Sequence, residues 1–341
     1  MPDLSIDVTN ACNRDCIHCL RDKIEPRKFF PLSLLKEVLN QARNCGIRYV
    51  SLTGGEPTLH PNWEEFLVTL AQSEFEFSIV SNGYKFRERT LPVLLEPIVR
   101  RHLDSVCFSL DGASANSHDA LRGKNSFQEI IEAANLCRLK GIPISLKTVV
   151  TNLNKEELAE IALLGSALGA IQHSFIALTP TPRAIDEKIV PSIKEMKKSY
   201  SFITGSLIPA MKTQINLEGF WGVDRALFAC NAYRQAYHVD HLGNLLFCCN
   251  LSHVCNGEKH SILGGELLAD LKRDSLKEGI IRHHRLLAQF TEDRLNDIPT
   301  KSPLSSFACW WCLRYFGKLG WTENYADSPW VREVFFGEAI E

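Results

Sequence analysis

The chain has 341 residues, of which 45% are hydrophobic and 23% charged, and its formal net charge is −2. These values are typical of globular proteins, so they exclude disordered and fibrous classes, and the length allows one large domain or two ordinary ones. A nearly neutral charge balance provides no basic surface field, so we expect no nucleic-acid partner. The longest nearly apolar run, residues 161–171, is too short to span a bilayer, and the N-terminus lacks the apolar segment of a signal peptide. We therefore expect a cytoplasmic protein without membrane contact.

Short, mostly apolar runs alternate with longer helical patterns over the first two hundred residues, and each run predicts a parallel strand covered on both faces. In chain order the predicted strands are Leu4–Val8, Tyr49–Leu52, Phe75–Val80, Ser105–Leu110, Ile142–Val150 and Ile171–Leu178. The residues that open the predicted helices are Ser33, Asn62, Ser126 and Asn154, and those that close two of them are Gly46 and Gly141. Six successive β–α units predict an α/β fold with right-handed crossovers. Because a closed barrel has eight units, we expect an open partial (β/α)6 TIM barrel, with a doubly wound sheet as the competing architecture.

The rhythm of strands and helices weakens after about residue 200. We therefore expect a barrel domain over residues 1–200 and a linker over 201–225. The Cys-, Gly- and aromatic-rich residues 226–316 predict a second, smaller domain. Residues 317–341 predict an aromatic tail that packs on the barrel or docks a partner.

Cysteine usage is unusual, with twelve Cys in a chain that we expect in a reducing compartment. Metal binding or catalysis is then a better explanation than disulfides. Cys12, Cys16 and Cys19 have the spacing C-x3-C-x2-C in the loop after the first predicted strand. Three thiolates can hold a cubane iron–sulfur cluster and leave one iron open for a small-molecule ligand. Zinc held by these thiolates and His18, in a scaffold without catalytic activity, is the alternative.

The loop sequence CNRDCIHC resembles the cluster loop of the radical S-adenosylmethionine (SAM) superfamily. Further motifs of that family follow at the ends of successive predicted strands, so the resemblance covers residues 4–185. They are Gly54-Gly55-Glu56-Pro57, Ser81-Asn82-Gly83, Ser109-Leu110-Asp111-Gly112, Arg122 and Pro180-Thr181-Pro182-Arg183-Ala184. In the last motif, Pro182 stands where the family has Gly.

The resemblance implies that Cys12, Cys16 and Cys19 bind a [4Fe-4S] cluster and that SAM binds its open iron. It further implies that a flavodoxin- or ferredoxin-type donor reduces the cluster, and that SAM is cleaved to a 5′-deoxyadenosyl radical that abstracts hydrogen from the substrate. Glu56 would accept a charge-assisted hydrogen bond from the SAM ammonium group. The predicted cofactor contacts are His18, Gly54, Gly55, Glu56, Pro57, Ser81, Asn82, Ser109, Asp111, Arg122 and Arg183.

A second group of cysteines lies in the last third of the chain. Its pattern, C-x12-G-x4-C followed by C-x2-C, is formed by Cys230, Gly243, Cys248, Cys309 and Cys312. This pattern resembles the first half of the SPASM domain and the shorter Twitch domain of radical SAM enzymes. The resemblance implies one auxiliary [4Fe-4S] cluster on the four cysteines, with Gly243 turning a hairpin between the first two. Four thiolates are also a structural zinc set, which is the alternative.

Cys249 and Cys255 remain in this region. Cys249 is a candidate hydrogen-atom donor to a substrate radical, as in radical SAM epimerases, and a spare small residue is the alternative. Radical SAM enzymes with such auxiliary domains modify ribosomally made precursor peptides, or they oxidise or epimerise carbohydrates, including aminoglycosides. We expect a precursor peptide, changed by epimerisation, crosslinking or excision, with its leader bound directly or by a separate recognition protein. A carbohydrate dehydrogenase or epimerase is the alternative.

Overall fold

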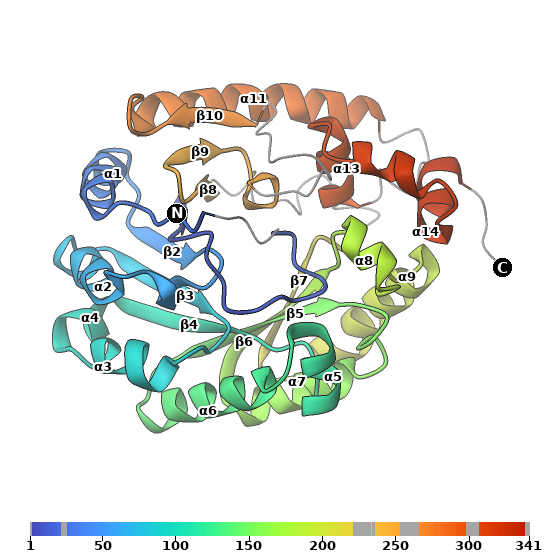
Figure 1. The fold of residues 1–341 in the computed structure, drawn as a ribbon, viewed down its shortest axis with the longest axis horizontal. Helices are drawn as coiled ribbons and strands as arrows, with labels where there is room; N and C mark the ends of the chain where they lie inside the picture. Colours follow the sequence, from blue (N-terminus) through green and yellow to red (C-terminus); the bar gives the residue numbers. More distant parts are fainter. Residues whose placement is uncertain are drawn as a thin grey trace.

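One ten-stranded sheet forms the centre of the fold, in a computed structural model that describes residues 2–21, 26–220, 233, 236–252, 266–297 and 307–337. The strand order is β10-β9-β8-β1-β2-β3-β4-β5-β6-β7 (Figure 1). The strands are β1 Asp3–Asp7, β2 Tyr49–Thr53, β3 Glu76–Ser81, β4 Leu103–Ser109, β5 Ile144–Val150, β6 Ala170–Ala177, β7 Gln214–Glu218, β8 Ala236–Val239, β9 Asn244–Leu246 and β10 Leu267–Asp270. Strands β1 to β7 run parallel in sequence order, which confirms the predicted α/β fold with a parallel sheet. The order has no reversal among them, as in an open barrel and unlike a doubly wound sheet.

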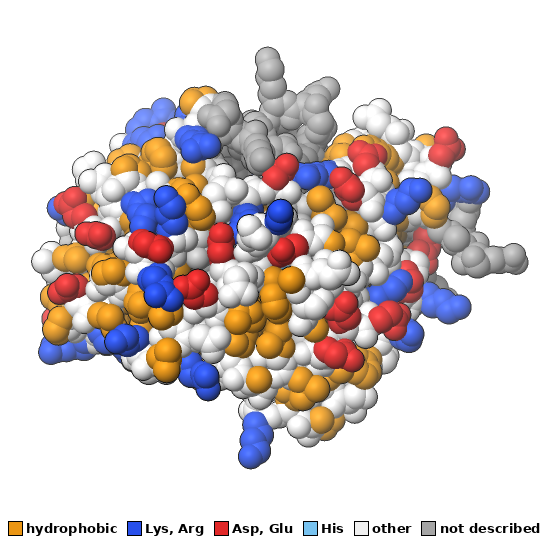
Figure 2. Space-filling view, turned by 60° about the horizontal axis from the view of Figure 1, so that its bottom comes forward, with side chains coloured by type: hydrophobic (Ala, Val, Ile, Leu, Met, Phe, Trp, Pro, Cys, Tyr) orange, Lys and Arg blue, Asp and Glu red, His pale blue; other side chains and the backbone are white. Residues whose placement is uncertain are grey.

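Helices cover the outer side of this curved sheet (Figure 1). The helices of the described residues are α1 Leu32–Asn44, α2 Trp63–Gln72, α3 Leu91–Leu94, α4 Pro97–His102, α5 Ala115–Arg122, α6 Ser126–Leu139, α7 Leu158–Ala167, α8 Pro182–Asp186, α9 Ile193–Phe202, α10 Ile208–Ala210, α11 Leu276–Asp297, α13 Ala308–Tyr315 and α14 Pro329–Val331. Figure 2 shows that Lys, Arg, Asp and Glu side chains are interspersed on the face formed by the lower helices of Figure 1. None of the helices in these described ranges combines the length and the hydropathy needed to cross a bilayer.

The buried apolar side chains of β1 to β4 gather mainly on one face, whereas the expectation was of strands that are mostly apolar and covered on both faces. Leu4, Ile6 and their equivalents on β2 to β4 are buried in one core with the helices. On the other face, Ser5, Ser51, Ser78 and Ser105 stand opposite one another in register across β1 to β4. Side chains alternate between the faces of a strand, so this row lines the inside of the barrel. Bulky branched residues fill the interior of closed barrels, whereas here a row of serines occupies part of the interior.

Three predicted helix N-caps are wrong. Helix α7 begins at Leu158, so Asn154 lies before its N-cap position, in a turn where its side-chain oxygen accepts the Thr151 N–H at 2.8 Å. Helix α1 begins at Leu32, so Ser33 lies inside its first turn. At α6 the Ser126 hydroxyl donates to the Asp119 carboxylate at 2.9 Å instead of capping its own helix. Asp119, on α5, also accepts the backbone N–H groups of Asn125 and Phe127. A side chain from the preceding helix thus satisfies the free donors that a local cap would have satisfied.

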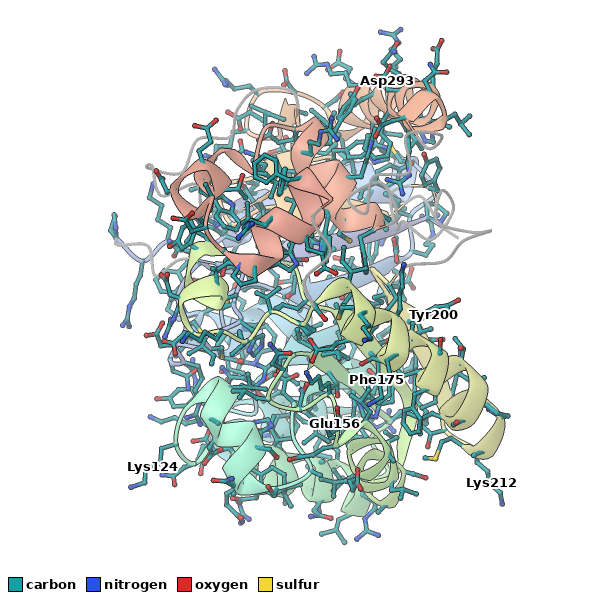
Figure 3. All side chains as sticks on the ribbon, turned by 90° about the vertical axis from the view of Figure 1, so that its right-hand side faces the viewer. Lys124, Glu156, Phe175, Tyr200, Lys212 and Asp293 are labelled. Carbon is teal, nitrogen blue, oxygen red and sulfur yellow. The ribbon has the colours of Figure 1, made fainter. Side chains whose placement is uncertain are left out.

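Residues after 200 complete the sheet at both edges. Residues 201–220, in the predicted linker, include β7, which pairs with β6. Strand β8 returns to pair with the other edge of β1, and an antiparallel hairpin continues into β9. Helix α11, marked by Asp293 in Figure 3, lies above α13. Because β8 to β10 extend the same sheet, the division into a barrel domain and an auxiliary domain stays a prediction.

The described part of the aromatic tail packs on the rest of the molecule. Trp321 and Trp330 are buried. The ring of Trp330 meets that of Trp310 on α13 edge to face, with centroids 5.1 Å apart. The Tyr325 hydroxyl donates to Asp186 on α8 at 3.1 Å. These contacts support the packing alternative over the docking alternative.

Candidate active site

The loop with the first three cysteines lies against the two glycines that follow β2. The Gly55 N–H donates to the Thr9 carbonyl at 2.7 Å, and the Glu56 N–H donates to the Ala11 carbonyl at 2.8 Å. A Cβ atom on Gly55 would lie 2.1 Å from the Ala11 oxygen, and one on Gly54 would lie 2.6 Å from the Thr9 oxygen. Only glycine permits this approach, so the glycine motif after β2 and the cysteine loop pack directly against each other.

Two predicted cofactor contacts point at the predicted cluster thiols. The Asn82 side-chain amide donates to Cys12 Sγ at 3.8 Å, and Arg122 Nη1 lies 3.9 Å from Cys16 Sγ. Burial raises the pKa of Cys12 to about 12 and also raises the pKa of Cys16, while Cys19 is exposed. Cysteines bind metals as thiolates, which burial disfavours here. The positive charge of a bound metal centre would stabilise the thiolates. The thiols and their hydrogen-bond donors therefore fit an iron–sulfur cluster.

Asp111 connects the end of β4 to the cysteine loop. Its Oδ2 atom lies 3.2 Å from His18 Nε2 and pairs with the Arg122 guanidinium, and its Oδ1 atom accepts the Val149 N–H at 2.8 Å. Burial alone would raise the pKa of Asp111, but the charge of Arg122 and the hydrogen bond from the Val149 N–H help to outweigh burial and lower it. The carboxylate therefore stays charged in a fully buried position.

His18 is held in this network as a neutral imidazole, because burial lowers its pKa to about 4. Its Nδ1 atom is buried and has no hydrogen-bond partner within the described residues, so this atom is available to a cofactor. In the described ranges, no three His, Cys, Asp or Glu side chains converge as the ligands of a single ion would. The arrangement favours a cubane cluster over the zinc alternative at the first site.

Glu56 is the buried carboxylate where the motifs after β2 and β3 meet. It has no exposed surface, and its oxygens accept the Ser81 hydroxyl at 2.9 Å and the Asn82 N–H at 2.7 Å. Burial raises its pKa, and no ion pair involves it within the described residues. A buried carboxylate with neutral donors alone fits a cationic ligand group such as an ammonium.

Arg183 lies against the cysteine loop. Its Nη1 atom is 2.7 Å from Asp15 Oδ1, between two cysteines of that loop. Pro182 occupies the first position of α8, and the Thr181 hydroxyl caps this helix by accepting the Ala184 N–H. Proline is favoured at a first helical position, which explains how it replaces the glycine of the family motif.

Three of the four cysteines predicted to hold the second cluster lie within the described residues, and they are Cys248, Cys309 and Cys312. Cys309 and Cys312 lie three residues apart on α13, which places them on one face of the helix. Cys248 follows the β8–β9 hairpin, whose turn contains Gly243 at φ +87, as predicted. The Asn250 amide, two residues after Cys248, donates to Cys309 Sγ at 3.6 Å. Cys230 and Cys255 lie outside the described residues.

Cys249 is exposed. A hydrogen bond from Cys248 lowers the pKa of the Cys249 thiol to about 6. Desolvation by the surrounding residues raises this pKa, and the positive charges of His238 and Lys147 lower it. The Cys249 thiol donates to the side-chain oxygen of Asn250 at 3.7 Å. Its role as a hydrogen-atom donor stays a prediction.

The barrel interior also holds charged groups that are not among the predicted site residues. Asp7 is fully buried and pairs with Arg21 at 2.7 Å and with His238 at 3.3 Å. Lys147 pairs with Glu218 at 3.3 Å. The signal was present, because Asp7 and Lys147 are single charged residues within otherwise apolar strand patterns.

Comparison with known proteins decides the family. Residues 6–165 match the model of the radical SAM superfamily. The part of the chain that carries the three cysteines and the motifs after β2, β3 and β4 is a radical SAM domain. This radical SAM enzyme is also similar to the mycofactocin maturase MftC of Mycolicibacterium smegmatis, with 27% identity over 276 residues, 78% of this chain and 67% of that relative.

Solved structures share its fold. Streptococcus suis SuiB bound to S-adenosylmethionine has a TM-score of 0.67 at 17% identity, covering 85% of this chain and 68% of SuiB. The same protein bound to its precursor peptide SuiA has a TM-score of 0.63 at 19% identity, covering 83% and 67%. The anSMEcpe structure with bound AdoMet and Cp18Cys peptide has a TM-score of 0.65 at 15% identity, covering 95% and 97%. The radical SAM domain implies a [4Fe-4S] cluster and SAM as cofactors of this enzyme.

Proposed function

We propose that this radical SAM enzyme modifies a ribosomally made precursor peptide. The observation that carries the proposal is the alignment with a maturase over 276 residues, which extends well beyond the barrel motifs. Two structures of the same fold hold a peptide. The polar groups of the interior support a substrate with many hydrogen-bonding groups.

In this proposal Cys12, Cys16 and Cys19 hold the cluster. When bound, the cluster and SAM supply a 5′-deoxyadenosyl radical, which removes a hydrogen atom from the substrate. Glu56 accepts the SAM ammonium group, and Arg122 holds the cysteine loop through its contact with Cys16.

The remaining predicted contacts surround these residues. They are His18, Gly54, Gly55, Pro57, Ser81, Asn82, Ser109, Asp111 and Arg183. Their backbone and side-chain groups orient SAM, and the protein around them excludes water from the radical.

We further propose one auxiliary [4Fe-4S] cluster on Cys230, Cys248, Cys309 and Cys312. The shared helix face of Cys309 and Cys312 and the approach of Asn250 to Cys309 support this site. A flavodoxin- or ferredoxin-type protein is the proposed electron donor. The leader of the peptide binds directly or through a separate recognition protein.

A carbohydrate substrate is the second candidate. The row Ser5, Ser51, Ser78 and Ser105 favours it, because hydroxyl groups hydrogen-bond to sugars as readily as to amides. Cys249 would then return hydrogen in an epimerisation. Loss of solvent deuterium incorporation in Cys249→Ala would support this role, and unchanged incorporation would exclude it.

The test uses anaerobically reconstituted enzyme with SAM and dithionite. Short peptides encoded beside its gene are added in turn, as is a pool of aminoglycosides, with Cys16→Ala as the control. We expect one peptide to increase 5′-deoxyadenosine formation and to change in mass. An increase with the aminoglycosides and with no peptide would refute the peptide substrate.

A further inference from the structure

Lys147 and Glu218 form an ion pair that crosses a strand on the wall of the barrel. Nζ of Lys147 on β5 lies 3.3 Å from Oε2 of Glu218 on β7. Strand β6 separates these two strands, and its residue in register with Lys147 is Ser174. The small Ser174 side chain leaves the space that the long lysine side chain needs to reach β7.

The pair faces the barrel interior and is open to a ligand. The neighbours of Lys147 along β5, Leu146 and Thr148, are buried on the helix side of the sheet. Since successive side chains point to opposite faces, Lys147 points inward. The side chains of Lys147 and Glu218 are 38% and 32% exposed, in contrast to the buried Asp7 and His238 on the opposite wall.

Lys147 also lies beside the proposed SAM site. It stands in direct register with Ser109, the proposed SAM contact at the end of β4. Neighbouring strands are about 4.8 Å apart, and residues in register present their side chains on the same face. A substrate group bound by Lys147 would therefore lie beside the proposed SAM site.

The hydrogen-bonding capacity of the pair is largely unused. Their mutual hydrogen bond is the only one that either side chain makes within the described residues. An ammonium group has three donors and a carboxylate has two acceptor oxygens, so donors and an acceptor remain side by side. Burial opposes the charge on Lys147, but Glu218 outweighs it and raises the pKa of the lysine, which stays charged.

This combination matches a peptide unit. The carbonyl of an amide accepts from an ammonium group, and its N–H donates to a carboxylate. The pair has no net charge, so it attracts neither a polyanionic nucleotide nor a polycationic aminoglycoside. We infer that Lys147 and Glu218 bind a backbone amide of the substrate beside the proposed SAM site and so determine specificity for peptides. This inference rests on the proposed function.

The test measures peptide capture by the anaerobically reconstituted holoenzyme loaded with SAM. The probe is an mRNA-displayed library of random 12-residue peptides. The variant Lys147→Met/Glu218→Gln removes both charges from the interior. The matched control, Lys198→Met/Glu156→Gln, removes an ion pair whose side chains are 75% and 73% exposed on the outside of the barrel; Glu156 is labelled in Figure 3. Iron content and circular dichroism report whether each variant is folded.

We expect at least about a tenfold loss of captured peptide in the interior variant and wild-type capture in the control, because each lost hydrogen bond involves a charged group. If the interior variant does not fold, the swapped pair Lys147→Glu/Glu218→Lys replaces it; this pair keeps a donor beside an acceptor and should recover capture. Wild-type capture by the folded interior variant, or no capture by a folded swapped pair, would overturn the inference alone. Absence of capture by the wild type would overturn the inference, whereas the peptide substrate itself would be refuted only if no peptide increases 5′-deoxyadenosine formation in the test of the proposed function.

Discussion

The guanidinium of Arg122 pairs with the buried carboxylate of Asp111 and also lies 3.9 Å from Cys16 Sγ. One arginine on α5 thereby joins the end of β4 to the loop of the cluster cysteines. Because Asp111 also contacts His18, the loop is fixed from two sides by protein groups alone. Side-chain contacts of the chain itself therefore hold the cysteine loop against the end of β4.

Replacing Asp111 by Asn should destabilise the protein at neutral pH. It leaves Arg122 buried without its partner, which costs about 3–5 kcal/mol of unfolding free energy. The folded-state pKa of Asp111 lies below its ordinary value of 3.8, so its stabilisation is present above that pH and is lost as the pH falls through the folded value. Urea unfolding should therefore show a large difference between wild type and variant at pH 7 that shrinks below about pH 4. The exposed Asp327→Asn is the control, and a difference independent of pH would contradict the ion pair.

Gly55→Ala should prevent formation of the first cluster. Its Cβ would lie 2.1 Å from the Ala11 oxygen, which forces the cysteine loop away from β2. Gly205→Ala meets nothing within 4 Å and serves as the control. Iron analysis after reconstitution should show about four fewer iron atoms per chain in Gly55→Ala alone. Full iron content in Gly55→Ala would mean that the close approach of the two motifs is dispensable.

Asn82→Ala should lower the reduction potential of the first cluster. The amide of Asn82 donates to Cys12 Sγ at 3.8 Å, and hydrogen bonds to cluster sulfurs raise the potential. Asn135, whose amide donates to a carbonyl within α6, provides the control Asn135→Ala. A redox titration followed by electron paramagnetic resonance measures the shift. An unchanged or higher potential in Asn82→Ala would show that this donor does not act on the cluster.

The order of the strands and the place of the first site follow from local sequence patterns. Apolar runs separated by helical periodicity predict β1 to β6 within a few residues. Gly46 and Gly141 adopt positive φ angles directly after α1 and α6, as helix ends require. Asn62 precedes α2 as predicted. Apolar runs, helix ends and helix starts each depend on a few neighbouring residues, so a single sequence is enough to predict them.

The features that sequence reasoning missed depend on contacts between distant segments. Nothing local shows that β8 pairs with β1, or that Asp119 replaces a cap at Ser126. The row of serines appears only when the register of four strands is known. Likewise, the pairing of Lys147 with Glu218 requires the order of β5, β6 and β7.

The most direct measurement combines metal analysis with SAM cleavage in the wild type and in the variant Cys12→Ala/Cys16→Ala/Cys19→Ala. After anaerobic reconstitution we expect about eight iron atoms per chain in the wild type and about four in the variant, for one SAM cluster and one auxiliary cluster. On reduction, the wild type should form 5′-deoxyadenosine from SAM and the variant should form none. Zinc in place of iron with SAM left intact, or 5′-deoxyadenosine formation by the variant, would contradict the account.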